Sequence, residues 1–459
     1  MDESKRQNIL NRMKSLQKNV DQGRVSRTEQ ALSSLPRRKQ PGFVDLPEYK
    51  QVVMQQRASE YLGMENPFYR AHEGASGATA SIGGRTFDNF ASYDYLGLNR
   101  HADVLGAAER SIRQFGISAS ASRLVAGERT IHHELETAIA ENYGTEAAIC
   151  FVSGYLTNVA AISCLMGPRD LVIHDEFMHN SGLAGVKLSG ATRRFFKHND
   201  VADLERVLKS LADQYERILV IAEGIYSMDG DVADLPGLLR LKEQYGFWLM
   251  LDEAHSLGVL GDSGRGVFEH YGVDPTSVDI WMGTLSKTTC SCGGYIAGSE
   301  ALVTLLKAQA GGFVYSVGLA PVLAGAAIAS LGVLRAEPQR TQDLRRNSQL
   351  FLELARKRGL DTGLSQGYSV VPVLVADSLR AVQLSNELYE AGVNVLPIIH
   401  PAVPEGLARL RFFITSAHTE DQIARAVDLT ATILERLKQQ NFGLASVDVG
   451  QLMAKLGKA

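Results

Sequence analysis

The sequence predicts an α/β protein with a large domain built on a mostly parallel sheet and a smaller C-terminal α/β domain. Between residues 100 and 320, short apolar runs alternate with helical patterns, which places helices over both faces of a parallel sheet. From about residue 340 the alternation restarts, which indicates the second domain. A chain of 459 residues is long enough to hold both.

The N-terminal region differs in composition from the rest. Residues 1–45 are rich in Lys, Arg, Gln and Ser and read as an extension and linker, with a possible short helix at 9–16. A flexible tail and a docking helix for a partner protein both fit this extension. Residues 46–105 form an N-terminal segment in which the Gly-Gly pair at 83–84 predicts a strand hairpin.

The large domain is predicted to span residues 106–335. Its buried strands are short apolar runs that end in polar residues. The strands are expected at 147–152, 171–174, 218–222 and 248–251.

One segment of this domain resembles a membrane span. Residues 317–334 are nearly all apolar, but they are rich in Gly and Ala, contain Pro321 and are marginal in length. A helix that is apolar all round is also expected where protein covers every side. We therefore predict a buried helix and no stable membrane span.

The smaller domain is predicted to span residues 336–440, followed by a tail at 441–459. Helices are expected at 345–358, 378–391 and 420–439, and strands at 370–375, 393–397 and 410–414.

Composition excludes several classes of function. The net charge of −4 gives no reason to expect nucleic acid as a partner. The first residues lack the apolar stretch of a signal peptide, and four cysteines are too few for a disulfide scaffold, so a cytoplasmic location is expected. Cys290 and Cys292 lack a second pair of ligands nearby, so no metal site is predicted.

Lys287 is the first candidate for chemistry. It ends a Gly-Thr-Leu-Ser-Lys run at 283–287, after the apolar run 279–282 and before a Gly-rich stretch at 293–298. A lysine held among small residues past a strand end can be desolvated, lose its proton and bind a carbonyl carbon. The alternative is a solvated surface lysine.

Asp252 is the second candidate. It follows the apolar run 248–251 directly, and ligands of α/β sheets bind beyond the carboxyl ends of such strands. A carboxylate there can keep a pyridine nitrogen protonated, as pyridoxal phosphate (PLP) chemistry requires. The alternative is a helix cap, because Asp readily starts a helix.

Together with these two residues, six blocks make the chain similar to the α-oxoamine synthase family of PLP enzymes. They occur in family order and cover roughly residues 66–435. The blocks are 95–98, 151–155 with Asn158, 223–231, 252–258, 283–287, and 409–411 followed by 417–419.

The resemblance implies a fold and a reaction. The fold is the aminotransferase-like PLP fold type I with a seven-stranded sheet, and the enzyme acts as a homodimer. The reaction is the decarboxylative condensation of an α-amino acid with an acyl thioester, on CoA or acyl carrier protein, to an α-amino ketone. The alternatives are an aminotransferase of the same broad fold and a non-catalytic partner subunit. Such subunits typically lack the cofactor lysine, whereas Lys287 is present with Asp252 and His255.

The resemblance also implies how the cofactor phosphate is held. Ser153, Gly154 and Tyr155 follow a strand and precede a helical pattern, where backbone amides attract phosphate. Thr284 resembles a residue that adds a hydroxyl, and Ser316 one that reaches the phosphate from the neighbouring subunit.

Three further residues match positions around the pyridine ring. His179 resembles the histidine that stacks on the ring, and a flat aromatic there holds the ring in plane. His255 resembles the residue that hydrogen-bonds the ring hydroxyl, and Ser227 another contact near it. Taken alone, His179 also fits a polar surface residue and Ser227 a turn residue.

Arg411 is the expected clamp for the amino-acid carboxylate. An arginine inside an apolar strand pattern is costly unless it is paired, and a bidentate carboxylate contact is its natural use. Arg409 is the fallback, because it lies two residues away on the same strand face. His418 matches the family pattern, but helix capping around Thr419 explains it equally well.

The chain departs from the family in two places. Tyr93 stands where many members carry Asn, which removes an amide from the substrate site. Tyr93 resembles the serine palmitoyltransferase side of the family and the members tied to polyketide or fatty-acid assembly lines, and residues 118–123 are similar to the latter group. A long acyl chain on CoA or acyl carrier protein is therefore expected. The loop at 289–291 also differs from the usual pattern.

Overall fold

The computed structural model describes residues 40–446, so the possible helix at 9–16 lies outside the described residues. The chain divides into two compact units, residues 1–63 with 449–459 and residues 64–448. In its described part, the first unit contains the short helix η1 (Phe43–Asp45) and helix α2 (Pro47–Tyr61), which starts at a proline as helices commonly do.

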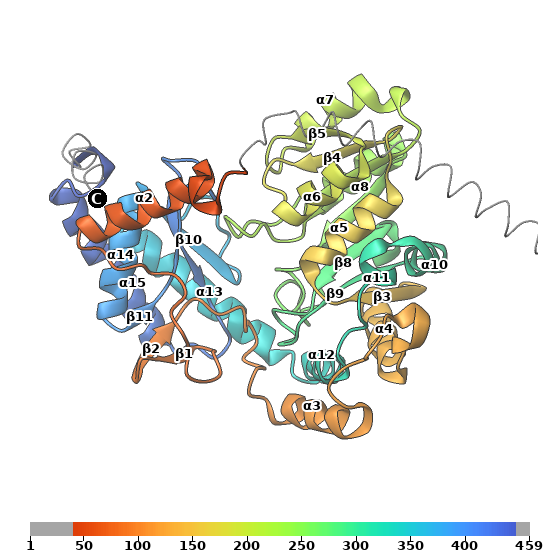
Figure 1. Cartoon of the computed structure of the whole chain (residues 1–459), viewed down its shortest axis with the longest axis horizontal. Helices are drawn as coiled ribbons and strands as arrows, with labels where there is room; N and C mark the ends of the chain where they lie inside the picture. The colour runs from red at the N-terminus through yellow and green to blue at the C-terminus, as the bar shows by residue number, and fades with distance from the viewer. Residues whose placement is uncertain (1–39, 447–459) are drawn as a thin grey trace, which may run out of the picture. The chain divides into compact units, whose positions relative to one another are not determined.

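The second unit is organised around a seven-stranded sheet in the order β3-β9-β8-β7-β6-β4-β5 (Figure 1). Every neighbouring pair is parallel except those made by β9, which is antiparallel to β3 and β8. The predicted mostly parallel sheet is therefore confirmed. The strands are β3 (Ala147–Phe151), β4 (Leu171–Asp175), β5 (Thr192–Phe196), β6 (Ile218–Glu223), β7 (Trp248–Asp252), β8 (Ile280–Thr284) and β9 (Gly294–Gly298).

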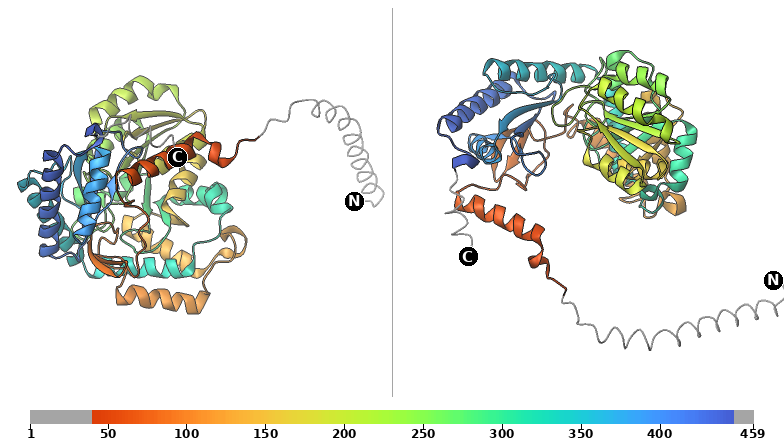
Figure 2. Two further views of the ribbon diagram at one scale, coloured as in Figure 1. Left: turned by 60° about the vertical axis from the view of Figure 1, so that its left-hand side comes forward. Right: turned by 90° about the horizontal axis from the view of Figure 1, so that it is seen from above.

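Helices cover both faces of this sheet (Figure 2). Alternate residues of β6 belong to different cores, with Leu219 in one and Val220 in the other, because successive side chains point to opposite faces. The Leu219 face is covered by α5 (Gly154–Leu165), α6 (Asn180–Ser189), α10 (Glu300–Gln309) and α11 (Gly311–Val314). The Val220 face is covered by α4 (Thr130–Tyr143), α7 (Val201–Leu211), α8 (Leu235–Tyr245) and α9 (Val267–Tyr271).

The apolar segment at 317–334 becomes helix α12 (Pro321–Ala336), which packs against α3 (Ala102–Phe115) and α4. Nine of its residues are buried, as expected for a helix covered by protein. Within residues 40–446, no helix is long and apolar enough to cross a membrane.

Two small three-stranded sheets lie beyond the large one. In the first, β12 (Pro397–Ile398) and β10 (Val370–Ala376) flank β13 (Ala408–Phe413). In the second, β1 (Thr79–Ile82) and β2 (Arg85–Asn89) form the predicted hairpin, and β11 (Val393–Asn394) pairs in parallel with β2. The accompanying helices are α13 (Gln339–Lys357), α14 (Ser378–Glu390) and α15 (Glu420–Gln439).

The two small sheets explain one difference from the sequence analysis. The expected strand at 393–397 is two short strands, because β11 joins the β2 sheet and β12 joins the β13 sheet. Gly83 and Gly84 both have positive φ, as a two-residue hairpin turn requires. The domain boundaries within residues 46–440 stay a prediction.

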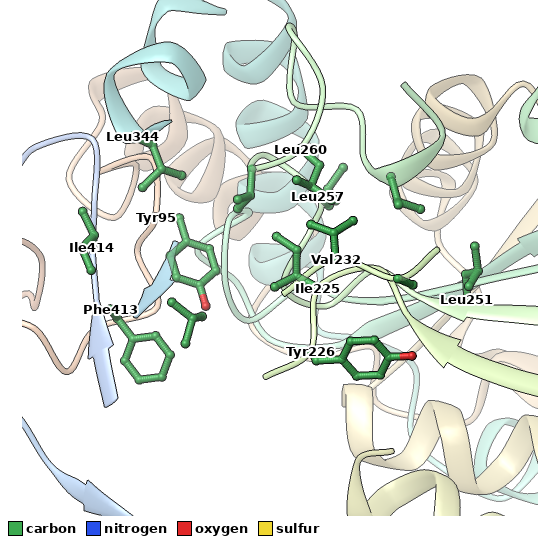
Figure 3. Packing of buried hydrophobic residues seen from close by; sticks show 14 of the residues in the cluster. Tyr95, Ile225, Tyr226, Val232, Leu251, Leu257, Leu260, Leu344, Phe413 and Ile414 are labelled. Atoms are coloured by element: carbon green, nitrogen blue, oxygen red, sulfur yellow. The ribbon is translucent and has the colours of Figure 1, made fainter. Parts of the chain in front are cut away.

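One buried cluster continues from the large sheet to β13 (Figure 3). Leu251 of β7 and Phe413 of β13 both belong to it, and Tyr95 and Ile225 lie between them in the same cluster. The carboxyl ends of the central strands and strand β13 are therefore parts of one packed structure.

Candidate active site

Three neighbouring strands end at the same edge of the large sheet. Glu223 ends β6, Asp252 ends β7 and Thr284 ends β8, and the first two are direct partners in the parallel register. Lys287 follows Thr284 in the turn that leads to β9. The sheet therefore gathers two carboxylates and one amine at the edge where α/β proteins bind ligands.

Lys287 does not behave as a solvated surface lysine. Its side chain is partly buried, and Nζ lies 5.6 Å from the centre of the Tyr93 ring. Removal from water lowers the pKa of Lys287 to about 8, although the Asp252 and Glu223 carboxylates act in the opposite direction. A substantial fraction of the amine is therefore neutral near pH 8.

Asp252 is buried, and both of its oxygens accept hydrogen bonds. Oδ2 accepts from Asn158 Nδ2 at 3.0 Å, and Oδ1 accepts from the backbone N–H of Ala254 at 2.9 Å. The helix-cap alternative is wrong, because turns follow Asp252 and the next helix begins only at Val267. These two hydrogen bonds hold the carboxyl group in one orientation.

A chain of hydrogen bonds runs from Asp252 to His179. Asn158 Nδ2 also donates to Ser181 Oγ at 2.9 Å, and Ser181 Oγ lies 2.7 Å from His179 Nδ1. His179 is the residue before α6, and its Nδ1 also accepts from the backbone N–H of Ser181. The sequence analysis missed the role of Ser181, although its position two residues after a candidate histidine could have indicated it.

Glu223 holds two candidate residues through their backbones. Oε1 accepts from the N–H of His179 at 2.8 Å, and Oε2 accepts from the N–H of Ser227 at 3.2 Å. Burial, and then the neighbouring Asp252, raise the pKa of Glu223 to about 8. Glu223 lies in the 223–231 block, but this role was not predicted, because it depends on contacts that only the folded chain makes.

The start of α5 forms a cradle of donors. Ser153 caps the helix, with Oγ accepting from the N–H of Leu156 at 3.1 Å. As the first amides of the helix, those of Gly154 and Tyr155 have no intrahelical carbonyl to bond. A Cβ on Gly154 would lie 2.8 Å from Thr284 Oγ1, so the Thr284 hydroxyl sits directly against this turn.

His255 is buried beside two tyrosines. Its Nδ1 lies 2.7 Å from the Tyr95 hydroxyl, and its ring meets the Tyr93 ring edge to face at 6.3 Å. Burial, together with the charges of Lys287 and Arg411, keeps the pKa of His255 well below its ordinary value. The imidazole is therefore neutral.

The two arginines of β13 have different environments. Arg409 is 5 % exposed, and its Nη1 donates to Asp229 Oδ1 at 2.8 Å, so its charge is neutralised within the protein. Arg411 is partly exposed. Its Nη1 donates to the Ser227 carbonyl at 2.8 Å, but its buried Nε has no partner among residues 40–446.

Two sequence candidates lie apart from this cluster of contacts. Ser316 lies between α11 and α12, and no hydrogen bond from its side chain is found in the described part of the chain. His418 is buried against Phe90, with ring centres 4.3 Å apart, and its Nδ1 accepts from the N–H of Thr415. His418 therefore packs the turn between β13 and α15 against Phe90.

Comparison with known proteins decides the family. Residues 86–429 match the family model described as aminotransferase class I and II. An 8-amino-7-oxononanoate synthase from Treponema denticola is 39 % identical over 78 % of this chain and 90 % of its own length. The chain belongs to the aminotransferase class I and II family.

Solved structures place it in the α-oxoamine synthase branch of that family. A serine palmitoyltransferase from Sphingomonas wittichii has a TM-score of 0.81 and 29 % identity, over 86 % of this chain and 99 % of that one. A serine palmitoyltransferase from S. paucimobilis with bound PLP and myriocin has a TM-score of 0.82 and 27 % identity, over 87 % and 100 %. The recognised family and the PLP fold type I are confirmed.

Family membership also fixes the cofactor and the enzyme class. The protein is a PLP-dependent C-acyltransferase, which condenses an α-amino acid with an acyl thioester and releases CO₂. The residues of this α-oxoamine synthase fit the cofactor. A desolvated amine at Lys287, a buried and oriented carboxyl group at Asp252 and donors at the start of α5 suit an aldehyde, a pyridinium and a phosphate respectively.

Proposed function

We propose that Lys287 is the covalent attachment point of PLP and the base that moves the Cα proton of the amino acid. The observation that carries this proposal is the position of its amine, at the carboxyl edge of the sheet beside Asp252 and Glu223, with a pKa of about 8. Such an amine is neutral often enough to attack an aldehyde and to accept a proton near neutral pH.

The residues around Lys287 hold the ring. Asp252 would bind the pyridine nitrogen, and Asn158 and Ala254 keep its carboxyl group oriented. His179 would stack on the ring, while His255 and Ser227 would contact its hydroxyl side. When bound, PLP supplies an electron sink that stabilises negative charge at Cα.

One chain forms most of the phosphate-binding site, and a residue of a second chain completes it. Ser153, the amides of Gly154 and Tyr155, and the Thr284 hydroxyl form the cradle. Ser316 of one subunit reaches the phosphate of its neighbour, so the working enzyme is a homodimer. The four free cysteines of the chain fit a cytoplasmic enzyme.

Arg411 binds the carboxylate of the amino acid. Its guanidinium is partly exposed, is not neutralised by a carboxylate, and keeps one buried N–H group free for a ligand. Arg409 is already paired with Asp229 and is not the clamp. Tyr93, beside Lys287, shapes the substrate space, and the acyl donor carries a long chain on CoA or acyl carrier protein.

Two experiments test these roles. Borohydride reduction followed by peptide mass spectrometry is expected to find the cofactor on Lys287, and an adduct on another lysine would refute the proposal. Thiol release is expected only with both an amino acid and an acyl thioester. An aminotransferase would instead release a keto acid and leave the cofactor in its amine form. Titration with glycine, alanine and serine identifies the amino acid by the change in the visible spectrum.

The dimer is tested by a separate measurement. Sedimentation of the holoenzyme is expected to give twice the chain mass, and Ser316→Ala is expected to weaken PLP binding without changing that mass. A fully active monomer would contradict the shared site.

A further inference from the structure

Residues 225–232 form a hairpin directly after β6. Ile225 and Val232 make an antiparallel bridge, and the N–H of Tyr226 donates to the carbonyl of Asp231 at 2.9 Å. A second bond at 2.9 Å runs from the N–H of Gly230 to the carbonyl of Tyr226. The segment is therefore an ordered element.

The tip of this hairpin meets the arginine strand. The Ser227 carbonyl accepts from Arg411, and the Asp229 carboxylate accepts from Arg409. A Cβ on Gly230 would lie 2.1 Å from the Val370 carbonyl of β10, so the tip and the small sheet are in close contact. The orientation of Arg411 thus depends on where the hairpin is held.

His198 holds the base of the hairpin. Its Nε2 lies 3.0 Å from Asp231 Oδ2, and its Nδ1 lies 2.9 Å from Asp175 Oδ1 at the end of β4. The ring stacks on Phe177 at 4.4 Å and meets Tyr226 edge to face at 4.5 Å. The His198 side chain is 6 % exposed, and those of Asp175 and Asp231 are 0 % and 4 % exposed.

This geometry requires a charged ring. Each ring nitrogen faces a carboxylate oxygen, and an imidazole donates from both nitrogens only when it is protonated. Burial by itself lowers the pKa of His198, but the hydrogen bonds to Asp175 and Asp231 raise it to about 10. Asn199 completes the cluster, because its backbone N–H donates to Asp175 and its side chain donates to Asp231.

The His198 imidazolium is also linked to the turn that precedes His179. Asp175 Oδ1 also accepts from the N–H of Phe177 at 2.8 Å, within the turn that leads to His179. One imidazolium therefore joins the turn that precedes His179 to the hairpin that carries Ser227.

We propose that His198 is a positioning residue, whose imidazolium holds the 225–232 hairpin so that Ser227 keeps Arg411 directed at the amino-acid carboxylate. The inference rests on the proposed role of Arg411. His198 contacts neither substrate nor cofactor in this scheme and acts through the hairpin.

The test compares four variants of the full-length holoenzyme. His198→Gln removes the ring that contacts both Asp175 and Asp231, and Asp231→Ala removes one of these two carboxylates. Asp231→Asn is the conservative variant, because Asp231 Oδ1 has no partner within residues 40–446 and an amide nitrogen there leaves Oδ2 in contact with His198. His133→Gln is the matched control, since His133 pairs with Glu128 on the surface and its side chain is 63 % exposed.

His198→Gln and Asp231→Ala are expected to raise the KM for the amino acid about 10-fold or more, since misplacing a binding group can cost ~100-fold. The KM for the acyl thioester and the affinity for PLP are expected to change less than about 2-fold. Asp231→Asn and His133→Gln are expected to match the wild type. The ¹⁵N spectrum of His198 in the wild type at pH 8 is expected to show both ring nitrogens protonated.

Three outcomes would overturn the inference. They are a neutral His198 ring at pH 8, an unchanged amino-acid KM in His198→Gln, or equal increases in both KM values. Failure of the proposed function looks different, because the wild type itself would then release no thiol with any amino acid. Unfolding temperatures of all four variants show whether each assay is made on folded protein.

Discussion

The carboxyl edge of the large sheet and strand β13 of the small sheet both place charged side chains inside the protein, but they do so differently. At the sheet edge, the Asp252 carboxylate lies close enough to Lys287 and Glu223 to raise the pKa of both groups. On β13, Arg409 is neutralised by Asp229, while Arg411 is left with hydrogen-bonding capacity. The first region prepares proton transfer, and the second prepares recognition of a carboxylate.

The largest effect on the reaction rate is expected from a substitution of Lys287. With the roles proposed for Lys287, Lys287→Ala removes both the covalent attachment of PLP and the base, and loss of positioned proton transfer alone costs about 10²–10⁴-fold in rate. The visible absorption of the holoenzyme is expected to change with it. Lys209→Ala is the matched control, since Lys209 lies on the surface and pairs with Glu205. An unchanged rate of thiol release in Lys287→Ala would show that the carboxyl edge of the large sheet is not where proton transfer takes place.

The arginine pair tests the second region. Arg411→Ala is expected to raise the KM for the amino acid about 10- to 100-fold, because a hydrogen bond to a charged group contributes roughly 1.5–3 kcal/mol. Arg409→Ala leaves Asp229 buried without its cation and is expected to destabilise the fold by about 3–5 kcal/mol. Kinetics and thermal unfolding of both variants separate the two roles. If Arg409→Ala affected KM more than Arg411→Ala, the clamp would be Arg409.

The same pair shows where prediction from sequence ends. The hairpin at 83–84, helix α15 and strands β3, β4, β6, β7, β10 and β13 could be predicted, because buried strands and amphipathic helices have their own periodicities. Arg409 and Arg411 share one strand face, and sequence alone could not separate them. The partner that distinguishes them, Asp229, lies 180 positions away in the chain.

The supporting residues of the site were missed for the same reason. Ser181 and Glu223 act through contacts with residues that only the folded sheet brings together. Lys287 and Asp252 were predicted because each lies at the end of an apolar strand or a few residues beyond it, which is a local signal. The two short strands β11 and β12 were merged into one, since a single apolar run gives no sign that it serves two sheets.

A smaller effect is expected on the pH dependence of cofactor loading. Only the neutral amine of Lys287 attacks an aldehyde, and with a pKa of about 8 half of it is neutral at pH 8, so the neutral fraction rises through that pH and levels off above it. The loading rate of the apoenzyme, followed by visible absorption, is expected to rise with a midpoint near pH 8, whereas an ordinary lysine would give a midpoint near pH 10.4. Free lysine mixed with PLP controls for titration of the cofactor itself. In Asp252→Asn the midpoint is expected to move down, because the carboxylate raises the pKa.

The smallest effect on the reaction is expected from His418, which lies in the turn between β13 and α15 and packs against Phe90. Burial lowers the pKa of His418 to about 4, below the value of about 6.5 for an unfolded histidine. Between these values the unfolded chain binds more protons, so the free energy of unfolding falls as pH drops from 6.5 toward 4. His418→Gln is expected to lower the unfolding temperature at pH 7, because it disturbs the stack on Phe90, and to reduce this acid sensitivity. It is expected to leave both KM values unchanged. A rise in the amino-acid KM would instead mean that packing around His418 affects the position of Arg411. The carboxyl edge of the large sheet and strand β13 could then not be treated as independent regions.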